Sequence, residues 1–157
     1  MYGLIIHSID KKYVPCLREA IDVLGDIALG YNWLISDYEC SIYPSTKIPF
    51  GGRFAWLTGS ELVSILKEYQ IQFIWGVATA YPKDIKHEEV LRYPLPFADG
   101  NTAFWKPEIT IQNPLAKIEI VPWDSTLLLV IAKSYELVEK FANKYPNSDD
   151  LEEYNRS

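Results

Sequence analysis

The chain has 157 residues, of which 48% are hydrophobic and 23% are charged, proportions typical of one folded globular domain and unlike a disordered protein. Fifteen Lys and Arg residues against 21 Asp and Glu residues give a net charge of −6, which argues against a protein that binds nucleic acid through a basic surface. Aromatic residues reach 14%, and this content is the first compositional pointer to a function.

Targeting signals and metal-ligand motifs are both missing from the sequence. Residues 1–8 lack the basic region and apolar stretch of a signal peptide, and the longest uninterrupted apolar run, 127–132, is far shorter than the roughly 20 residues that span a bilayer. Cys16 and Cys40 have no Cys or His neighbour at ligand spacing, and the chain has only two His. We therefore expect reduced cysteines, no metal, no cofactor, no membrane partner and a cytoplasmic location.

The first half of the chain alternates between strand and helix patterns. Thr58 and Glu61 have the T-x-x-E spacing of a capping box, so a helix should begin there. Apolar runs and periodicity predict the other elements, which are a strand at 2–7, an amphipathic helix at 13–24 with Pro15 in its first turn, strands at 31–36 and 38–43, a loop at 44–52 and a long central strand at 71–80.

The last part of the chain predicts a strand meander followed by a helix. Polar and apolar residues alternate at 108–112 and 117–121, whereas 126–132 is apolar on both faces and should be an interior strand. A helix is expected at 134–145, with Ser134 as its N-cap. The tail, 147–157, holds four acidic residues and one Arg and is expected to be solvated or frayed.

This order of elements predicts an α+β fold. Strands come in runs and helices are few, which favours a mainly antiparallel sheet with about three helices and a C-terminal strand meander followed by a helix. We expect residues 1–146 to form a single domain and residues 147–157 to be an acidic tail.

Motifs that carry catalysis are missing, so we expect a protein without enzymatic activity. His7 would need a partner acid to act as a general base, and the sequence places none beside it. His87 precedes two Glu residues but lacks the second His of a metalloprotease helix, because position 91 is Leu91. Neither a G-x-S-x-G nucleophile elbow nor a phosphate-binding loop is present.

The segment 81–107 is the principal candidate for a binding site. It has no sustained period and contains four prolines, and structureless segments of this length are usually functional or mobile. Exposed aromatic side chains held by prolines are typical binding anchors. The alternative is that the same rings close the core. The candidate binding residues are Tyr93, Phe97, Asp99, Phe104 and Trp105, with the Asp99-Gly100-Asn101 turn presenting Phe97 and Phe104 outward together.

Five stretches of the sequence resemble a family of small Gram-positive bacterial proteins classified as a domain of unknown function. They are Tyr31-Asn32-Trp33, Phe97 to Asn101, Ile111 to Ala116, Glu119 to Ser125 and Glu136 to Glu152. The resemblance covers nearly the whole chain and implies a bacterial cytoplasmic protein, but it supplies no activity and no catalytic residues. In composition alone, the chain also resembles the immunity proteins that neutralise nuclease-type toxins.

Three hypotheses for the function follow from these observations. The first is a non-catalytic module that binds another protein through the aromatic, Pro-rich segment, as an immunity-like or regulatory protein would. The second is a small enzyme whose site joins His7 or His87 to Asp99 or Asp124. The third is a small-molecule binder with a pocket lined by Trp56, Trp75 and Trp105. A His–carboxylate pair in a cleft, a closed aromatic pocket or a flat acidic or aromatic patch would separate them.

Overall fold

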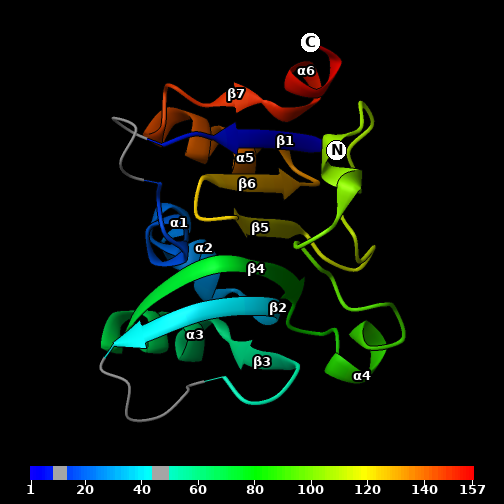
Figure 1. The fold of residues 1–157 in the computed structure, drawn as a ribbon. Helices are drawn as coiled ribbons and strands as arrows, with labels where there is room; N and C mark the ends of the chain where they lie inside the picture. The colour runs from blue at the N-terminus through cyan, green and yellow to red at the C-terminus, as the bar shows by residue number, and fades with distance from the viewer. Residues whose placement is uncertain (9–13, 44–49) are drawn as a thin grey trace.

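The structure, a computed structural model, describes residues 1–8, 14–43 and 50–157. In these ranges seven strands form one antiparallel sheet in the order β3-β2-β4-β5-β6-β1-β7 (Figure 1). The strands are β1 (Tyr2–Ile6), β2 (Tyr31–Tyr43), β3 (Phe54–Thr58), β4 (Gln70–Pro82), β5 (Ile118–Trp123), β6 (Leu127–Ala132) and β7 (Asp149–Asp150). The predicted α+β class with a mainly antiparallel sheet is confirmed.

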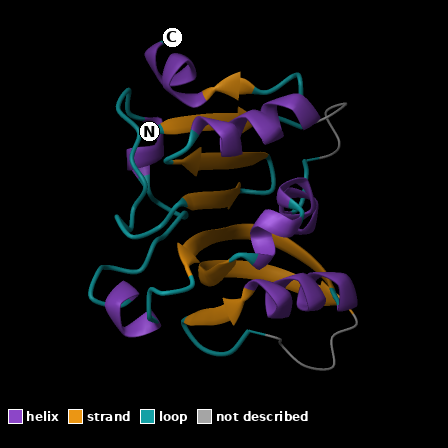
Figure 2. Cartoon of the chain, turned by 180° about the vertical axis from the view of Figure 1, so that it is seen from behind, coloured by secondary structure: helices purple, strands orange, loops and turns teal. Residues whose placement is uncertain are grey.

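The longer helices cover one face of this sheet, as the view from behind shows (Figure 2). The helices are α1 (Leu17–Leu24), α2 (Asp26–Leu29), α3 (Gly59–Glu68), α4 (His87–Val90), α5 (Tyr135–Lys144) and α6 (Leu151–Arg156), with a 3₁₀ turn, η1, at Thr102–Trp105. Among the described residues only α1, α3 and α5 have eight or more residues, which agrees with the prediction of about three helices. Helix α1 begins after Pro15, and Tyr13, which was expected on its apolar face, lies outside the described residues.

The two faces of the sheet bury separate hydrophobic clusters because successive strand residues point to opposite sides. On the helix face, strand residues such as Ile120 and Val130 pack against α1, α3 and α5. On the opposite face, Val121 and Leu129 pack against residues 83–117 and against Leu151 of α6. We refer to residues 83–117 as the covering segment, and it forms the second layer over the sheet.

Strand β6 has the character predicted for an interior strand. It lies between β5 and β1, and both Leu128 and Leu129 are fully buried, one on each face. The long strand β4 is also interior, between β2 and β5. The capping box at the start of α3 is confirmed, since Glu61 N donates to Thr58 Oγ1 at 3.1 Å and Thr58 N donates to Glu61 Oε1 at 3.0 Å.

Strand β2 corrects the prediction of two strands at 31–36 and 38–43. The two stretches form one strand with a bulge, where the register with β4 shifts between Ser36 and Glu39. Asp37 at the bulge has a φ of 47°, a left-handed conformation that Asp tolerates better than most residues. The bulge turns the Asp37 carboxylate away from the ladder. Strand β3, at the edge beyond β2, was not predicted.

The prediction of a strand at 108–112 is wrong. Ile109 and Ile111 are both buried against the sheet, but their backbone pairs with no described strand, so the meander runs through β4, β5 and β6. The tail is ordered rather than frayed, because residues 149–150 pair with β1 and Leu151 is fully buried. Within the described ranges, no helix has the length and apolar character required to cross a membrane.

Candidate functional site

The turn that carries Phe97 is the most distinctive feature of the covering segment. The Phe97 side chain is 46% exposed, although its neighbours Pro96 and Ala98 are buried. We refer to residues 96–99 as the Phe97 turn. An exposed ring between two buried residues is carried by a backbone that is itself part of the packed layer, so its position is set by the fold.

Two side chains of strand β2 form hydrogen bonds with the main chain of the Phe97 turn. Ser36 Oγ donates to the carbonyl of Pro96 at 2.8 Å in a buried hydrogen bond. Asp37 Oδ2 accepts from the main-chain N–H of Ala98 at 2.7 Å and from that of Asp99 at 3.1 Å. Hydrogen bonds to an ionised carboxylate are about twice as strong as those between neutral groups. The bulge in β2 therefore places a carboxylate where it orders the turn.

Two amide side chains complete the bonding of Phe97. Gln112 Oε1 accepts from Phe97 N at 3.0 Å, and Gln112 Nε2 donates to the carbonyl of Phe97 at 3.0 Å. Asn101 Nδ2 also donates to the Phe97 carbonyl, at 2.9 Å. The main chain of the exposed residue is thereby satisfied by side chains from two other positions of the same segment.

A buried carboxyl group lies beneath Gln112. Glu119 on β5 is fully buried, and Gln112 N donates to its Oε1 at 3.4 Å. Its Oε2 has no hydrogen-bond partner among the described residues. Burial raises the pKa of Glu119 to about 8, an effect that the hydrogen bonds from Gln112 partly offset. The protonated, neutral form of the group is therefore favoured at neutral pH and below.

The predicted residues Phe104 and Trp105 belong to the packed layer. Phe104 is 3% exposed and Trp105 is half-buried, and both rings meet Trp123 edge-on, with ring centroids 5.8 and 5.1 Å apart. Trp75 on β4 packs on the same Trp123 ring at 4.8 Å. The expectation that Phe97 and Phe104 point outward together is wrong, because the η1 turn directs Phe104 onto the sheet.

The other predicted residues remain on the surface. Tyr93 is 40% exposed, and Asp99 is exposed in the predicted turn, where Gly100 has a φ of 80°. The structure thus divides the five candidates between an exposed set, Tyr93, Phe97 and Asp99, and a packed set, Phe104 and Trp105. Sequence reasoning missed Asp37, Gln112 and Glu119, because each acts through a contact between positions far apart in the chain.

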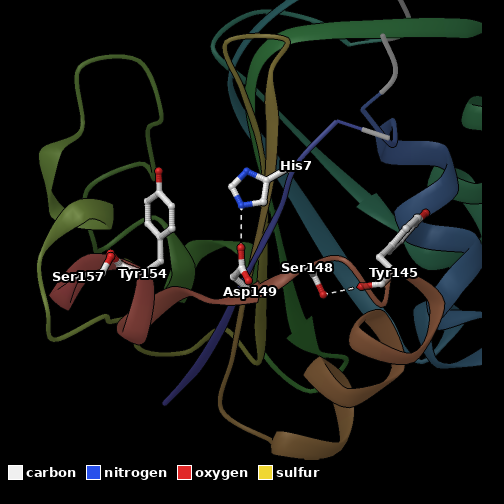
Figure 3. Close-up of polar contacts among 6 residues, drawn as sticks. All are labelled: His7, Tyr145, Ser148, Asp149, Tyr154 and Ser157. Carbon is white, nitrogen blue, oxygen red and sulfur yellow. Dashed lines mark hydrogen bonds and ion pairs between the residues drawn. The ribbon is translucent and has the colours of Figure 1, made fainter. Parts of the chain in front are cut away.

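His7 does find a partner acid, but not one of those proposed from the sequence. His7 Nε2 donates to Asp149 Oδ2 of β7 at 3.1 Å, and the two side chains are 37% and 61% exposed (Figure 3). The adjacent Ser148 donates its hydroxyl to the carbonyl of Tyr145 at 2.6 Å, so it is not bonded to His7. The pair links the end of β1 to β7 on an open surface rather than in a cleft.

The three tryptophans proposed to line one pocket do not gather at one place. Trp75 and Trp105 both pack on Trp123, whereas Trp56 packs on Tyr81 and lies 6.1 Å from the ring of His87. A hollow of about 860 Å³ lies instead between the start of α1 and the first residues of β4, and none of the five candidates lines it. Across the part of the chain that the structure describes, no three His, Cys, Asp or Glu side chains gather as metal ligands do.

Comparisons with known proteins found no protein similar to this chain. No family model matches the chain, and neither a curated protein nor a solved structure matches it. The resemblance to the Gram-positive family therefore stays a prediction.

Proposed function

We propose that this chain is a non-catalytic module that binds another protein through the surface around Phe97, in the manner of an immunity-like or regulatory protein. The supporting observation is that an exposed aromatic ring is carried by a main chain whose groups are bonded by Ser36, Asp37, Gln112 and Asn101. A ring on an ordered backbone loses little freedom when a partner buries it, so more of its contact area contributes to affinity.

The charge of the chain indicates the kind of partner. The net charge is −6, and two exposed aspartates belong to this surface. Asp99 follows Phe97 by two residues, and Asp37 bonds the main-chain N–H groups of Ala98 and Asp99. A partner that offers an apolar pocket surrounded by basic residues would complement this surface, and complementary charge speeds association. The proposal includes a cytoplasmic location, which the two unpaired cysteines, Cys16 and Cys40, favour.

Affinity capture from an extract of the native cells tests this proposal, with three baits and identification by mass spectrometry. The baits are the wild-type chain, Phe97→Ala and Tyr43→Ala. Tyr43 is a matched control because it is also an exposed aromatic residue, 72% exposed, but lies at the far end of β2. Both substitutions remove an exposed ring, so a general loss of surface hydrophobicity affects the two variants alike.

The proposal predicts a protein that the wild-type and Tyr43→Ala baits capture equally and that Phe97→Ala captures about tenfold less well, the loss expected for a central aromatic contact. Equal capture by all three baits, or a loss confined to Tyr43→Ala, would contradict it. Thermal unfolding of each bait beforehand establishes that a lost partner reflects the missing ring and not an unfolded chain.

A further inference from the structure

Glu119 is a buried carboxyl group that lies between the sheet and the covering segment. Glu119 is fully buried on the face of the sheet that the covering segment packs against, and one of its carboxyl oxygens has no partner among the described residues. An ionised carboxylate needs several hydrogen bonds or a cation to be stable away from water. Among the described residues only Gln112 donates to Glu119, with its N–H 3.4 Å from Oε1, so the site favours the neutral acid over the carboxylate.

The groups that face Glu119 leave its charge uncompensated. Strand β4 places Thr79 opposite it and Tyr81 on the same face, and β6 places Ile131 opposite it. The Tyr81 phenol shares a 2.9 Å hydrogen bond with the Thr79 hydroxyl, and burial together with Glu119 raises the pKa of Tyr81 above its ordinary value of 10.0. Tyr81 therefore stays neutral while Glu119 titrates.

The described basic residues near this region do not pair with Glu119. Lys117 lies two residues before Glu119 and is exposed, and Lys133 Nζ donates to the carbonyl of Pro114 in the covering segment. No basic side chain in the described part of the chain forms an ion pair with Glu119. Ionisation of Glu119 would thus leave a buried negative charge that only water can solvate.

Gln112 connects this buried group to the surface. Its main-chain N–H donates to Glu119, while its side chain bonds both main-chain groups of Phe97. Water can reach Glu119 once the stretch around residue 112 moves away from β5. Because the Phe97 turn is bonded separately to β2 through Ser36 and Asp37, a displacement of residue 112 that hydrates the carboxylate also breaks the hydrogen bonds between Gln112 and Phe97.

We propose that Glu119 is a pH-dependent latch on the Phe97 turn, closed while its carboxyl group is protonated and opened when that group loses its proton. The proton goes to solvent, and the opened covering segment lets water solvate the carboxylate. Opening of the latch should weaken the binding of a partner protein at alkaline pH. This consequence rests on the proposed function of the Phe97 surface. The opening itself is a property of the isolated chain, so it can be measured without a partner.

Amide hydrogen exchange measured by NMR between pH 5.5 and 9 tests the latch. The readout is the protection of the Phe97 and Gln112 amides after correction for the intrinsic pH dependence of exchange. Release of one proton on opening predicts that this protection falls by up to about tenfold per pH unit until the pH reaches the pKa of Glu119, and then becomes constant. The Glu61 amide, bonded to Thr58 on the helix face, is the matched control and should show no such fall.

The variant Glu119→Gln keeps a neutral group of the same shape and should remove the pH dependence at both amides. If that variant does not fold, Gln112→Ala provides the second test. The Phe97 amide should then be poorly protected at every pH, while the amide of residue 112, which can still donate to Glu119, keeps its pH dependence. Protection that does not change with pH in the wild-type chain, or an equal fall at the core amides of β6, would overturn the latch. Neither result depends on whether Phe97→Ala affects capture of a partner.

Discussion

Gln112 bonds Phe97 through both ends of its side-chain amide. Its Oε1 accepts from the N–H of Phe97 and its Nε2 donates to the carbonyl of the same residue, each at 3.0 Å. The pattern reproduces the paired hydrogen bonds that two residues of neighbouring antiparallel strands exchange. A residue without a neighbouring strand thereby has both of its main-chain groups hydrogen-bonded, although its ring remains on the surface.

Truncation of Phe97 should leave the stability of the chain almost unchanged, whereas truncation of Phe104 should lower it strongly. Phe97→Ala removes an exposed ring and should change the free energy of unfolding by no more than about 0.5 kcal/mol. Phe104→Ala removes a buried ring that packs on Trp123 and should cost roughly 3–5 kcal/mol. Chemical denaturation of both variants measures the difference. A large loss in Phe97→Ala would mean that the ring closes the core, and the binding proposal would fail.

A hydrogen-bond acceptor on the side chain of residue 37 should be required for the order of the Phe97 turn. Asp37→Ala leaves the N–H groups of Ala98 and Asp99 without an acceptor and places Ala at a positive φ, so a loss of about 1–3 kcal/mol is expected. Asp37→Asn is the matched control, because it keeps an acceptor oxygen and tolerates the same backbone conformation. Denaturant titration should find the Asp37→Asn variant much closer in stability to the wild type than the Asp37→Ala variant. Equal stability of the two variants would contradict the role assigned to this acceptor oxygen.

Local signals in the sequence predicted the elements whose formation depends on neighbouring residues. The Thr58–Glu61 spacing located the start of α3, and the apolar run at 126–132 identified an interior strand. The same type of signal was present at Asp150 and was overlooked. Asp150 Oδ1 accepts from Glu153 N at 3.0 Å and begins α6, so the D-x-x-E spacing could have predicted an ordered tail.

The errors arise where a pattern has two structural solutions. Alternation at Ile109 and Ile111 fits a strand, but it fits equally well an extended chain that lies flat on an apolar sheet, and only the tertiary fold decides between them. Asp37 interrupts an alternating run, and both a loop and a bulge have that appearance in a sequence.

Part of the candidate site could be predicted and part could not. Proline and aromatic content identified residues 81–107, which supply most of the covering segment, and Phe97 is exposed as expected. The contacts that fix it join Asp37 to Ala98 and Gln112 to Glu119, pairs brought together by the sheet and by the path of the covering segment. No periodicity reports such pairs, because they depend on which side chains the folded layers bring face to face.

Leu129 should be among the most costly core positions to truncate. It is fully buried on β6 beneath the covering segment, so Leu129→Ala should lower the free energy of unfolding by roughly 2–5 kcal/mol. Thr126→Ala, at the exposed turn before the same strand, is the control and should stay within about 0.5 kcal/mol of the wild type. A small loss in Leu129→Ala would be inconsistent with a packed second layer.

The stability of the chain should depend on pH through Glu119. Because its pKa is raised from 4.5 to about 8 in the folded state, the folded chain binds this proton more tightly than the unfolded chain does. The stabilisation is fully present below pH 4.5, is lost progressively as the pH rises toward 8 and changes no further above that. Glu119→Gln should flatten this part of the stability profile in denaturant titrations over that range. An unchanged slope in the variant would assign the pH dependence to other groups.

Site-specific photo-crosslinking tests the central claim, that the Phe97 ring contacts a partner protein, most directly. Phe97 is replaced by benzoyl-phenylalanine, an aromatic residue that forms a covalent bond with whatever lies against it on irradiation, and Tyr43 is replaced in the same way as the exposed control. The chain is irradiated inside its native cells, and covalent adducts are identified by mass spectrometry. We expect an adduct with one protein from position 97 and none with that protein from position 43. The absence of any adduct at position 97, together with an adduct at position 43, would contradict it.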